Sequence, residues 1–348
     1  MNRVLFILKR KEDYNVDRDS HIGLSTGLYN SAKFIDDMLN EMGIESKIVV
    51  VPDNNHIDRE VTQFKPTHVI IEALWVVPQK FQILQKLHPT VQWIVRLHSE
   101  MPFMAGEGMA MDWIGEYSCF KNMSIGINAP RMLSEVKILC QTKHPGRIWD
   151  YRLMYLPNYY PQEYKTKKLD KSKEYIDIGC FGAVRPLKNH LVQAFAAIEF
   201  ANRIGKKLRF HVNAGRIEMQ GQPAVNNLKG LFEHLYEQGH QLINHTWTPR
   251  EEFLELCSQM DIAMQCNFSE TFNIVGADII SQGVPLIGSK EIPWQALGLC
   301  DPTDSQDIIK GLEFAYKYPQ LNVKVNQLAL KRYTNKTKKI WYNQFKEK

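Results

Sequence analysis

Short apolar runs alternate with amphipathic stretches along almost the whole chain. Many of these runs are rich in β-branched residues and place apolar side chains at both odd and even positions. That pattern is typical of parallel strands that helices cover on both faces. It predicts strands at residues 4–8, 47–51, 68–72, 92–97, 124–127, 154–156, 176–181, 208–213, 261–265 and 285–288.

The stretches between these runs have the spacing of amphipathic helices, which we place at 28–42, 191–204, 224–238 and 250–259. Alternating strands and helices predict an α/β fold with doubly wound parallel sheets. The alternation occurs twice. A segment with two prolines at 157–161, followed by a lysine-rich segment up to residue 174, separates the two series and is typical of a linker.

We therefore expect three parts in the chain. These are an N-terminal Rossmann-like domain at 1–160, a second Rossmann-like domain at 172–324, and a C-terminal helix at 325–348 that packs back on the first domain. Parallel sheets of this kind bind ligands at the carboxyl ends of their strands, so the two domains are expected to hold substrates in a cleft between them.

Composition narrows the class of protein. A chain of 348 residues with 44% hydrophobic content fits a globular protein of about two domains, and a net charge of +5 permits an anionic ligand without requiring nucleic acid. The six cysteines include no C-x-x-C pair, which favours reduced thiols and a cytoplasmic location over disulfides or a zinc site. No apolar run reaches the ~18 residues of a membrane span.

The segment 269–288 carries the strongest indication of function. Glu270 lies in a predicted turn, a helix-like run follows from Asn273, and Gly283 ends that run before the last strand. Amides at a helix N-terminus bind anions, and a carboxylate accepts hydrogen bonds from hydroxyl groups. The segment therefore predicts a site for a phosphate and a polyol.

A second candidate loop follows the first strand of the second domain. Gly182 permits a tight turn there, and Arg185 and Lys188 would lie over the end of the sheet. A guanidinium and an ammonium group together suit the oxygens of a diphosphate. The alternative is two solvated cations in a surface loop.

The two segments, FGAVRPLKN and ETFNIVGADIISQGVPLIG, resemble those of retaining glycosyltransferases of the GT-B fold, of the family-four type. The resemblance covers most of residues 175–290. It implies that Arg185 and Lys188 bind the diphosphate of a nucleotide-sugar donor and that Glu270 contacts the hydroxyls of the sugar.

The same resemblance implies further donor contacts. The amides near Asn273, Ile274 and Val275 would hold the distal phosphate, and Asp278 would bind the nucleotide ribose. Asp278 stands where the family has glutamate, so it is shorter by one methylene, and it is alternatively an ordinary acid on a helix surface. Trp247 lies where the fold usually walls the nucleotide base, although a tryptophan of the core or surface explains it equally well.

The first domain should supply the acceptor side. Gly23, Ser25 and Thr26 precede a predicted helix and form either a cradle for an anion or sugar or a plain helix cap. His98 follows the strand at 92–97, and in the resembling family a histidine there approaches the transferred sugar; a structural histidine is the alternative.

The segment after His98 is rich in glycine and methionine, so we expect an irregular wall of the cleft. One of its acids, among them Glu100, is a candidate base toward the acceptor. The Asp17-Arg18-Asp19 triplet matches a metal signature of another glycosyltransferase fold and is discounted as a chance match.

The resemblance implies a retaining transfer from a nucleotide-diphospho-sugar, expected to be a UDP-sugar, with no metal and no other cofactor. The segment after His98 and the length of the chain resemble phage-encoded glycosyltransferases, some of which modify hydroxymethylated bases in DNA. Basic and aromatic residues near the C-terminus form either a surface for DNA phosphates or an ordinary solvated helix face. A polysaccharide or lipid acceptor, a nucleotide-sugar 2-epimerase of the same fold and a non-catalytic binding module are the alternatives.

Overall fold

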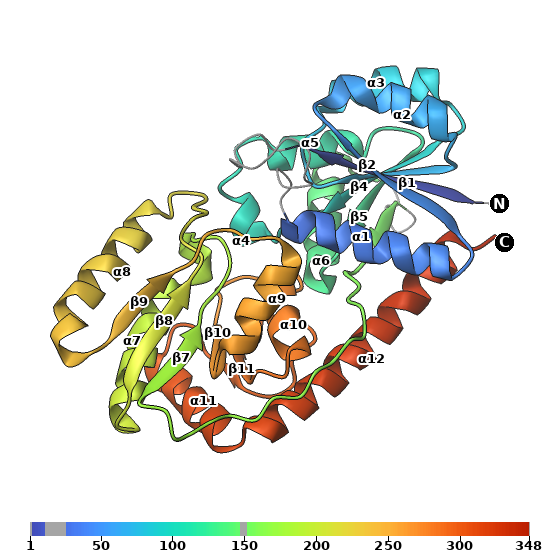
Figure 1. Ribbon diagram of the computed structural model, residues 1–348. Helices are drawn as coiled ribbons and strands as arrows, with labels where there is room; N and C mark the ends of the chain where they lie inside the picture. The colour runs from blue at the N-terminus through green and yellow to red at the C-terminus, as the bar shows by residue number, and fades with distance from the viewer. Residues whose placement is uncertain (1, 11–25, 147–151, 348) are drawn as a thin grey trace. The chain divides into compact units, whose positions relative to one another are not determined.

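The computed structural model describes residues 2–10, 26–146 and 152–347. The chain divides into two compact units (Figure 1). Unit 1 contains Met1–Pro161 and Thr334–Lys348, and unit 2 is the continuous stretch Gln162–Tyr333.

Unit 1 is built on a six-stranded sheet in the order β2-β1-β3-β4-β5-β6, and all neighbouring strands are parallel. The strands are β1 (Arg3–Lys9), β2 (Glu45–Val51), β3 (His68–Glu72), β4 (Gln92–Leu97), β5 (Met123–Ile127) and β6 (Leu153–Tyr155). Its helices are α1 (Thr26–Glu41), α2 (Ile57–Phe64), α3 (Pro78–Leu87), α4 (Met101–Met104), α5 (Ala110–Tyr117) and α6 (Pro130–Lys143), with a short 3-10 turn, η1 (Asn54–His56).

Both faces of this sheet are buried, because successive side chains of a strand point to opposite faces. Leu5 and Ile7 of β1 pack in one cluster with residues of α2, α3, α5 and α6. Phe6 and its neighbours pack in a second cluster with α1 and with Trp341 and Phe345 near the C-terminus. This two-sided burial explains why the strands read as almost continuous apolar runs.

Unit 2 has a second six-stranded parallel sheet, in the order β12-β11-β10-β7-β8-β9. The strands are β7 (Tyr175–Gly179), β8 (Lys207–Val212), β9 (Gln241–Asn244), β10 (Ile262–Gln265), β11 (Leu286–Ser289) and β12 (Leu299–Cys300). Its elements between strands are η2 (Pro186–Lys188), α7 (His190–Arg203), α8 (Gln222–Leu235), η3 (Tyr236–Gln238), α9 (Arg250–Gln259), α10 (Ile274–Ser281) and α11 (Ser305–Lys317).

Helices cover both faces of this sheet as well. Residues of α7, α8 and α11 form one apolar cluster with β7, β8 and β10, and α10 packs on β10 and β11 with α9 beside it (Figure 1). The fold of each unit therefore matches the predicted doubly wound α/β arrangement.

The last helix, α12 (Pro319–Phe345), contributes to both units. In unit 2, the buried Asn322 side chain accepts a hydrogen bond from the Leu286 amide (2.9 Å) and donates one to the Leu286 carbonyl (3.0 Å). In unit 1, the Trp341 indole N–H donates to the Pro157 carbonyl (2.8 Å). The helix begins at Pro319, earlier than the expected start at residue 325.

None of the helices in the described ranges has the length and apolar character that crossing a bilayer requires.

The segment after Pro161 is extended but anchored to unit 2. The Lys165 amide donates to the Ser281 carbonyl (2.6 Å), and the chain passes so close to Gly283 that a side chain there would collide with backbone atoms of 165–167. Gly283 also has a φ of +78°, so both its conformation and its surroundings require glycine.

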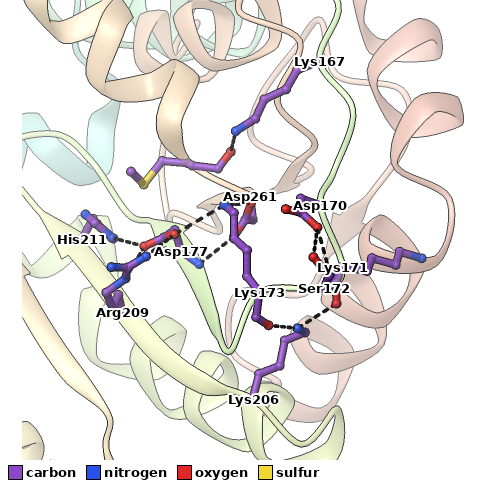
Figure 2. Close-up of polar contacts among 11 residues, drawn as sticks. Lys167, Asp170, Lys171, Ser172, Lys173, Asp177, Lys206, Arg209, His211 and Asp261 are labelled. Carbon is purple, nitrogen blue, oxygen red and sulfur yellow. Dashed lines mark hydrogen bonds and ion pairs between the residues drawn. The ribbon is translucent and has the colours of Figure 1, made fainter.

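A charged network fixes the next part of this segment at the start of β7 (Figure 2). The Lys173 ammonium lies 2.8 Å from the Asp261 carboxylate and 3.7 Å from that of Asp177. Burial alone would raise the pKa of Asp177, but hydrogen bonds from His211 and Arg209 outweigh it and lower that pKa to about 2. The lysine-rich segment expected to be a linker is therefore attached by its charges.

The predicted strands are all present, and those at 68–72 and 92–97 have the predicted bounds. Two short strands, β9 and β12, were not predicted, and neither were helices α2, α3, α6 and α11. The expected irregular wall after His98 is wrong in part, because α4 and α5 occupy much of that segment.

We predict that Asn322→Ala destabilises unit 2 by about 2 kcal/mol or more, because it leaves the buried Leu286 amide and carbonyl without these partners. Urea unfolding should reveal the loss. Leu321→Ala on the same helix is the control: Leu321 is 51% exposed, so the change should stay within about 0.5 kcal/mol. Equal effects of the two substitutions would contradict the prediction.

Candidate functional site

The carboxyl edge of the unit 2 sheet places two loops side by side. β7 and β10 are adjacent and parallel, with Ile178 opposite Ile262 and Gly179 opposite Ala263. The loop after β7 (residues 180–189, here the β7 loop) and the loop after β10 (residues 266–273, the β10 loop) therefore leave the sheet together. These are the two segments that the sequence assigned to the donor.

The β7 loop turns sharply and is held in place by one asparagine. Gly182 has a φ of +114° and Asn189 has a φ of +56°, both in the region that favours glycine or asparagine. The Asn189 amide group donates to the carbonyls of Cys266 (3.1 Å) and Pro302 (2.7 Å). The loop is thereby attached to the β10 loop and to the segment after β12.

Lys188 and Glu270 form an ion pair between the two loops. Only 11% of the Lys188 side chain and 9% of that of Glu270 are exposed. Asn267 also donates to the same carboxylate oxygen, Oε1, at 2.8 Å, and Asn273 donates to it at 3.3 Å. Burying charges is costly unless they are paired and hydrogen-bonded, and these contacts supply both conditions.

Asn273 also begins helix α10. Its φ of +63° turns the chain, its Oδ1 accepts from the Gly276 amide (2.6 Å), and its Nδ2 donates to Gln265 Oε1 (2.9 Å). The first turn of α10, which contains Ile274 and Val275, is thus fixed beside Glu270. Its amides remain the predicted phosphate ligands.

A third loop, after β8 (residues 213–221, the β8 loop), adds residues that the sequence analysis missed. Glu218 pairs with Arg185 (Nη1 to Oε2, 3.2 Å) and with Arg216. The Arg216 guanidinium lies 5.0 Å from the centre of the Trp247 ring, a cation–π arrangement. The sequence does contain one indication of this loop. Charged residues lie between Gly215 and Gly221, directly after the strand predicted at 208–213.

Asp278 and Trp247 lie farther along the same unit. Asp278 is 4% exposed and pairs with Arg250 at 2.9 Å, so it is not an acid of the helix surface. Trp247 is partly buried under Arg216. Their roles toward a ribose and a base stay predictions.

In unit 1, His98 belongs to a buried charged cluster at the carboxyl ends of β3 and β4. It bonds to Glu72, whose carboxylate also accepts from Arg96 at 3.2 Å, and Glu72 and Arg96 are both fully buried. Burial lowers the pKa of His98, and Arg96 adds to this effect, while Glu72 opposes it. Burial alone would raise the pKa of Glu72, but Arg96 and His98 outweigh it and lower that pKa. Near pH 7 these shifts favour a neutral imidazole bonded to an ionised carboxylate.

Glu100 is 4% exposed, lies at the N-cap position of α4 and pairs with Arg131. The other expected residues of this unit are less well placed. Gly23, Ser25 and the Asp17-Arg18-Asp19 triplet lie outside the described residues. Thr26 begins α1, but its side chain is likewise outside the description.

His190, the first residue of α7, is a further group that the sequence analysis did not single out. It is 2% exposed, and within the described part of the chain neither of its ring nitrogens has a hydrogen-bond partner. Burial lowers its pKa to about 3, and the neighbouring charges of Lys188 and Arg185 contribute. The imidazole beside the two candidate diphosphate ligands is therefore neutral near pH 7.

No protein-family model matches this chain, and no curated protein sequence matches it either. Solved structures match it over nearly its full length. Sucrose-phosphate synthase from Thermosynechococcus elongatus has a TM-score of 0.67 and 11% identity, covering 99% of this chain and 97% of its own. A UDP-forming trehalose-phosphate synthase from Burkholderia xenovorans has a TM-score of 0.67 and 12% identity, with coverages of 99% and 98%. The Anabaena protein HepE in complex with UDP-glucose has a TM-score of 0.62 and 11% identity, with coverages of 99% and 98%.

At identities this low, the likeness establishes the fold. The chain has the GT-B fold of these neighbours, with one six-stranded parallel sheet in each Rossmann-like unit and a C-terminal helix. The fold expected from the sequence is confirmed.

His190 predicts a pH dependence of stability. Its folded-state pKa of about 3 lies below the unfolded value of about 6.5, so the unfolded chain binds the extra proton first and stability falls as the pH drops below about 6.5. Between pH 7 and pH 5 this group should cost the wild type about 2 kcal/mol. His190→Gln should show a correspondingly smaller decrease in urea unfolding experiments.

The control is His234→Gln, because His234 is an exposed histidine of the same unit. It should retain the pH dependence of the wild type. If His190→Gln retains it as well, then His190 is protonated in the folded protein and the prediction is wrong.

Proposed function

We propose that this protein is a retaining glycosyltransferase that moves a sugar from a nucleotide-diphospho-sugar, expected to be a UDP-sugar, to an acceptor hydroxyl. The observation that carries the proposal is the buried pair of Lys188 and Glu270 at the carboxyl edge of the unit 2 sheet, with Arg185 in the same loop. It combines a cationic site for a diphosphate with a fixed carboxylate for hydroxyl groups. The GT-B neighbours, one of them in complex with UDP-glucose, support the same class of reaction.

The cations would act on the leaving group. As the bond between the sugar C1 and the diphosphate oxygen breaks, negative charge grows on the diphosphate. Arg185, Lys188 and the amides at the start of α10 would stabilise that charge, which is most effective when the donors are already in position. We propose that this set needs no metal ion, so chelation of divalent cations should leave turnover unchanged.

Glu270 would orient the sugar. Its carboxylate is held by Lys188, Asn267 and Asn273, so it can accept hydrogen bonds from sugar hydroxyls without rearranging. The acceptor oxygen would form its bond to C1 on the face that the diphosphate leaves, and the acceptor proton would pass to the departing phosphate oxygen. This sequence of bond changes retains the configuration at C1 and needs no covalent intermediate with the enzyme.

The remaining expected contacts are part of the proposal. Asp278 would bind the ribose, Trp247 the base, and His98 the transferred sugar. The bond to Glu72 fixes the ring orientation of His98 and places a hydrogen on Nε2, which leaves Nδ1 as the acceptor nitrogen. Glu100, paired with Arg131, is the proposed base candidate nearest to that histidine in the sequence.

The names of the similar structures suggest which acceptors to test. The similar structures include synthases named for trehalose phosphate and sucrose phosphate, which makes sugar phosphates the first acceptors to test. The DNA acceptor expected from the sequence, a hydroxymethylated base, stays a prediction. The reason to test it is that α12 carries six lysine or arginine residues and no acid, which suits DNA phosphates. Polysaccharide and lipid acceptors are the remaining candidates to test. The cytoplasmic location, which was inferred from the cysteines, also stays a prediction.

A two-step experiment tests the proposal. Nucleotide sugars and nucleoside diphosphates are first ranked by thermal shift, because a ligand that binds only the folded state raises the unfolding temperature. The best donor is then incubated with no acceptor and with each acceptor in turn. Transfer with retained configuration supports the proposal, whereas conversion of the sugar without an acceptor would identify an epimerase.

Arg185→Ala and Glu270→Gln should each lower turnover by about 100-fold or more, because each removes a charge that acts on the diphosphate or on the sugar. Arg203→Ala is the matched control for the first: Arg203 is an exposed arginine of the same unit and should give nearly wild-type rates. Circular dichroism establishes that each variant is folded. Near-wild-type turnover of both site variants would contradict the assignment.

A further inference from the structure

The β8 loop is fixed against the β7 loop by its backbone. The Val184 amide donates to the Arg216 carbonyl (2.9 Å), and the Glu218 amide donates to the Val184 carbonyl (2.9 Å). Gly221 lies so close that a Cβ there would be 2.1 Å from the Val184 carbonyl oxygen. This packing brings Glu218 beside Arg185, the residue that follows Val184.

Glu218 lies between two arginines. One carboxylate oxygen faces Arg185 at 3.2 Å, and the other contacts Arg216. The side chains of Arg185 and Glu218 are 22% and 23% exposed, against 11% and 9% for Lys188 and Glu270, so this pair is the more open of the two to a ligand.

We infer that Glu218 is a placeholder carboxylate, which occupies the Arg185 guanidinium until the diphosphate of the donor replaces it. This inference rests on the proposed function, because it assigns the anion that Arg185 binds. A guanidinium binds carboxylates and phosphates through the same donors. A diphosphate on Arg185 therefore competes with Glu218, which keeps its second partner, Arg216.

The conformation of the β8 loop fits such an exchange. Met219 and Gln220 are consecutive non-glycine residues with φ values of +43° and +62°, a strained arrangement that the contacts with Val184 maintain. Ile217 and Met219 are 38% and 37% exposed, so part of the apolar surface of this loop already faces solvent.

The opposite role for Glu218 makes the inference testable. A carboxylate that merely orients Arg185 helps the donor to bind, so its loss weakens binding. A placeholder competes with the donor, so its loss strengthens binding. The two roles predict changes of opposite sign in the dissociation constant of a nucleoside diphosphate.

The experiment measures UDP binding by isothermal titration calorimetry to the wild type, Glu218→Gln and Glu237→Gln. Glu237 is an exposed glutamate of the same unit, so its variant has the same change in net charge away from the site. Glu218→Gln should bind UDP about threefold to tenfold more tightly, and Glu237→Gln should match the wild type. The donor KM should fall and inhibition by UDP should strengthen by a similar factor.

A second pair of variants assigns the gain to Arg185. Glu218→Gln should improve UDP binding less in an Arg185→Ala background than in the wild type. If the wild type binds UDP and Arg185→Ala weakens it, but Glu218→Gln gives equal or weaker binding than the wild type, the donor site stands and the placeholder role is overturned. If UDP and the other nucleoside diphosphates bind none of these proteins, the donor site is wrong and the inference fails with it.

Discussion

The parallel pairing of β7 with β10 is the constraint on which the candidate site depends. It brings Lys188 and Glu270 together although 82 residues separate them in the chain. Neither charge would be tolerated alone at this degree of burial, since an unpaired buried ion costs several kcal/mol. The sheet therefore determines both where the site forms and that its two opposite charges occur together.

The same principle applies throughout the charged clusters of the molecule. Arg96 and Glu72 are fully buried as a pair in unit 1, and the acid of the β8 loop is shared by two arginines in unit 2. Groups that are already paired and oriented lose little freedom when a substrate binds. A ligand of such a site must either hydrogen-bond to a charged side chain that is already paired or displace its partner. This favours ligands that carry both an anionic group and hydroxyl groups.

Features that depend on a local pattern of residues could be predicted from the sequence, whereas features that depend on contacts between distant segments could not. Strands such as 68–72 were predictable because burial on both faces leaves an uninterrupted apolar run, whereas β9 is a half-buried edge strand and β12 has two residues, so neither leaves such a run. The positions of Lys188 and Glu270 in loops at strand ends were predictable, because each follows a buried apolar run. The ion pair of Asp278 could not be predicted, because its partner Arg250 comes from another helix. The position of Glu218 could not be predicted either, because it depends on backbone hydrogen bonds to Val184.

The shared helix α12 has a consequence for the order in which the protein can fold during synthesis. Unit 2 is continuous, whereas the apolar core of unit 1 includes Trp341 and Phe345. Residues 162–333 can therefore fold as soon as they leave the ribosome, while the first 161 residues must wait with an incomplete core. The N-terminal part of the chain is therefore made first but completed last, and the apolar surface that α12 covers stays exposed during the interval.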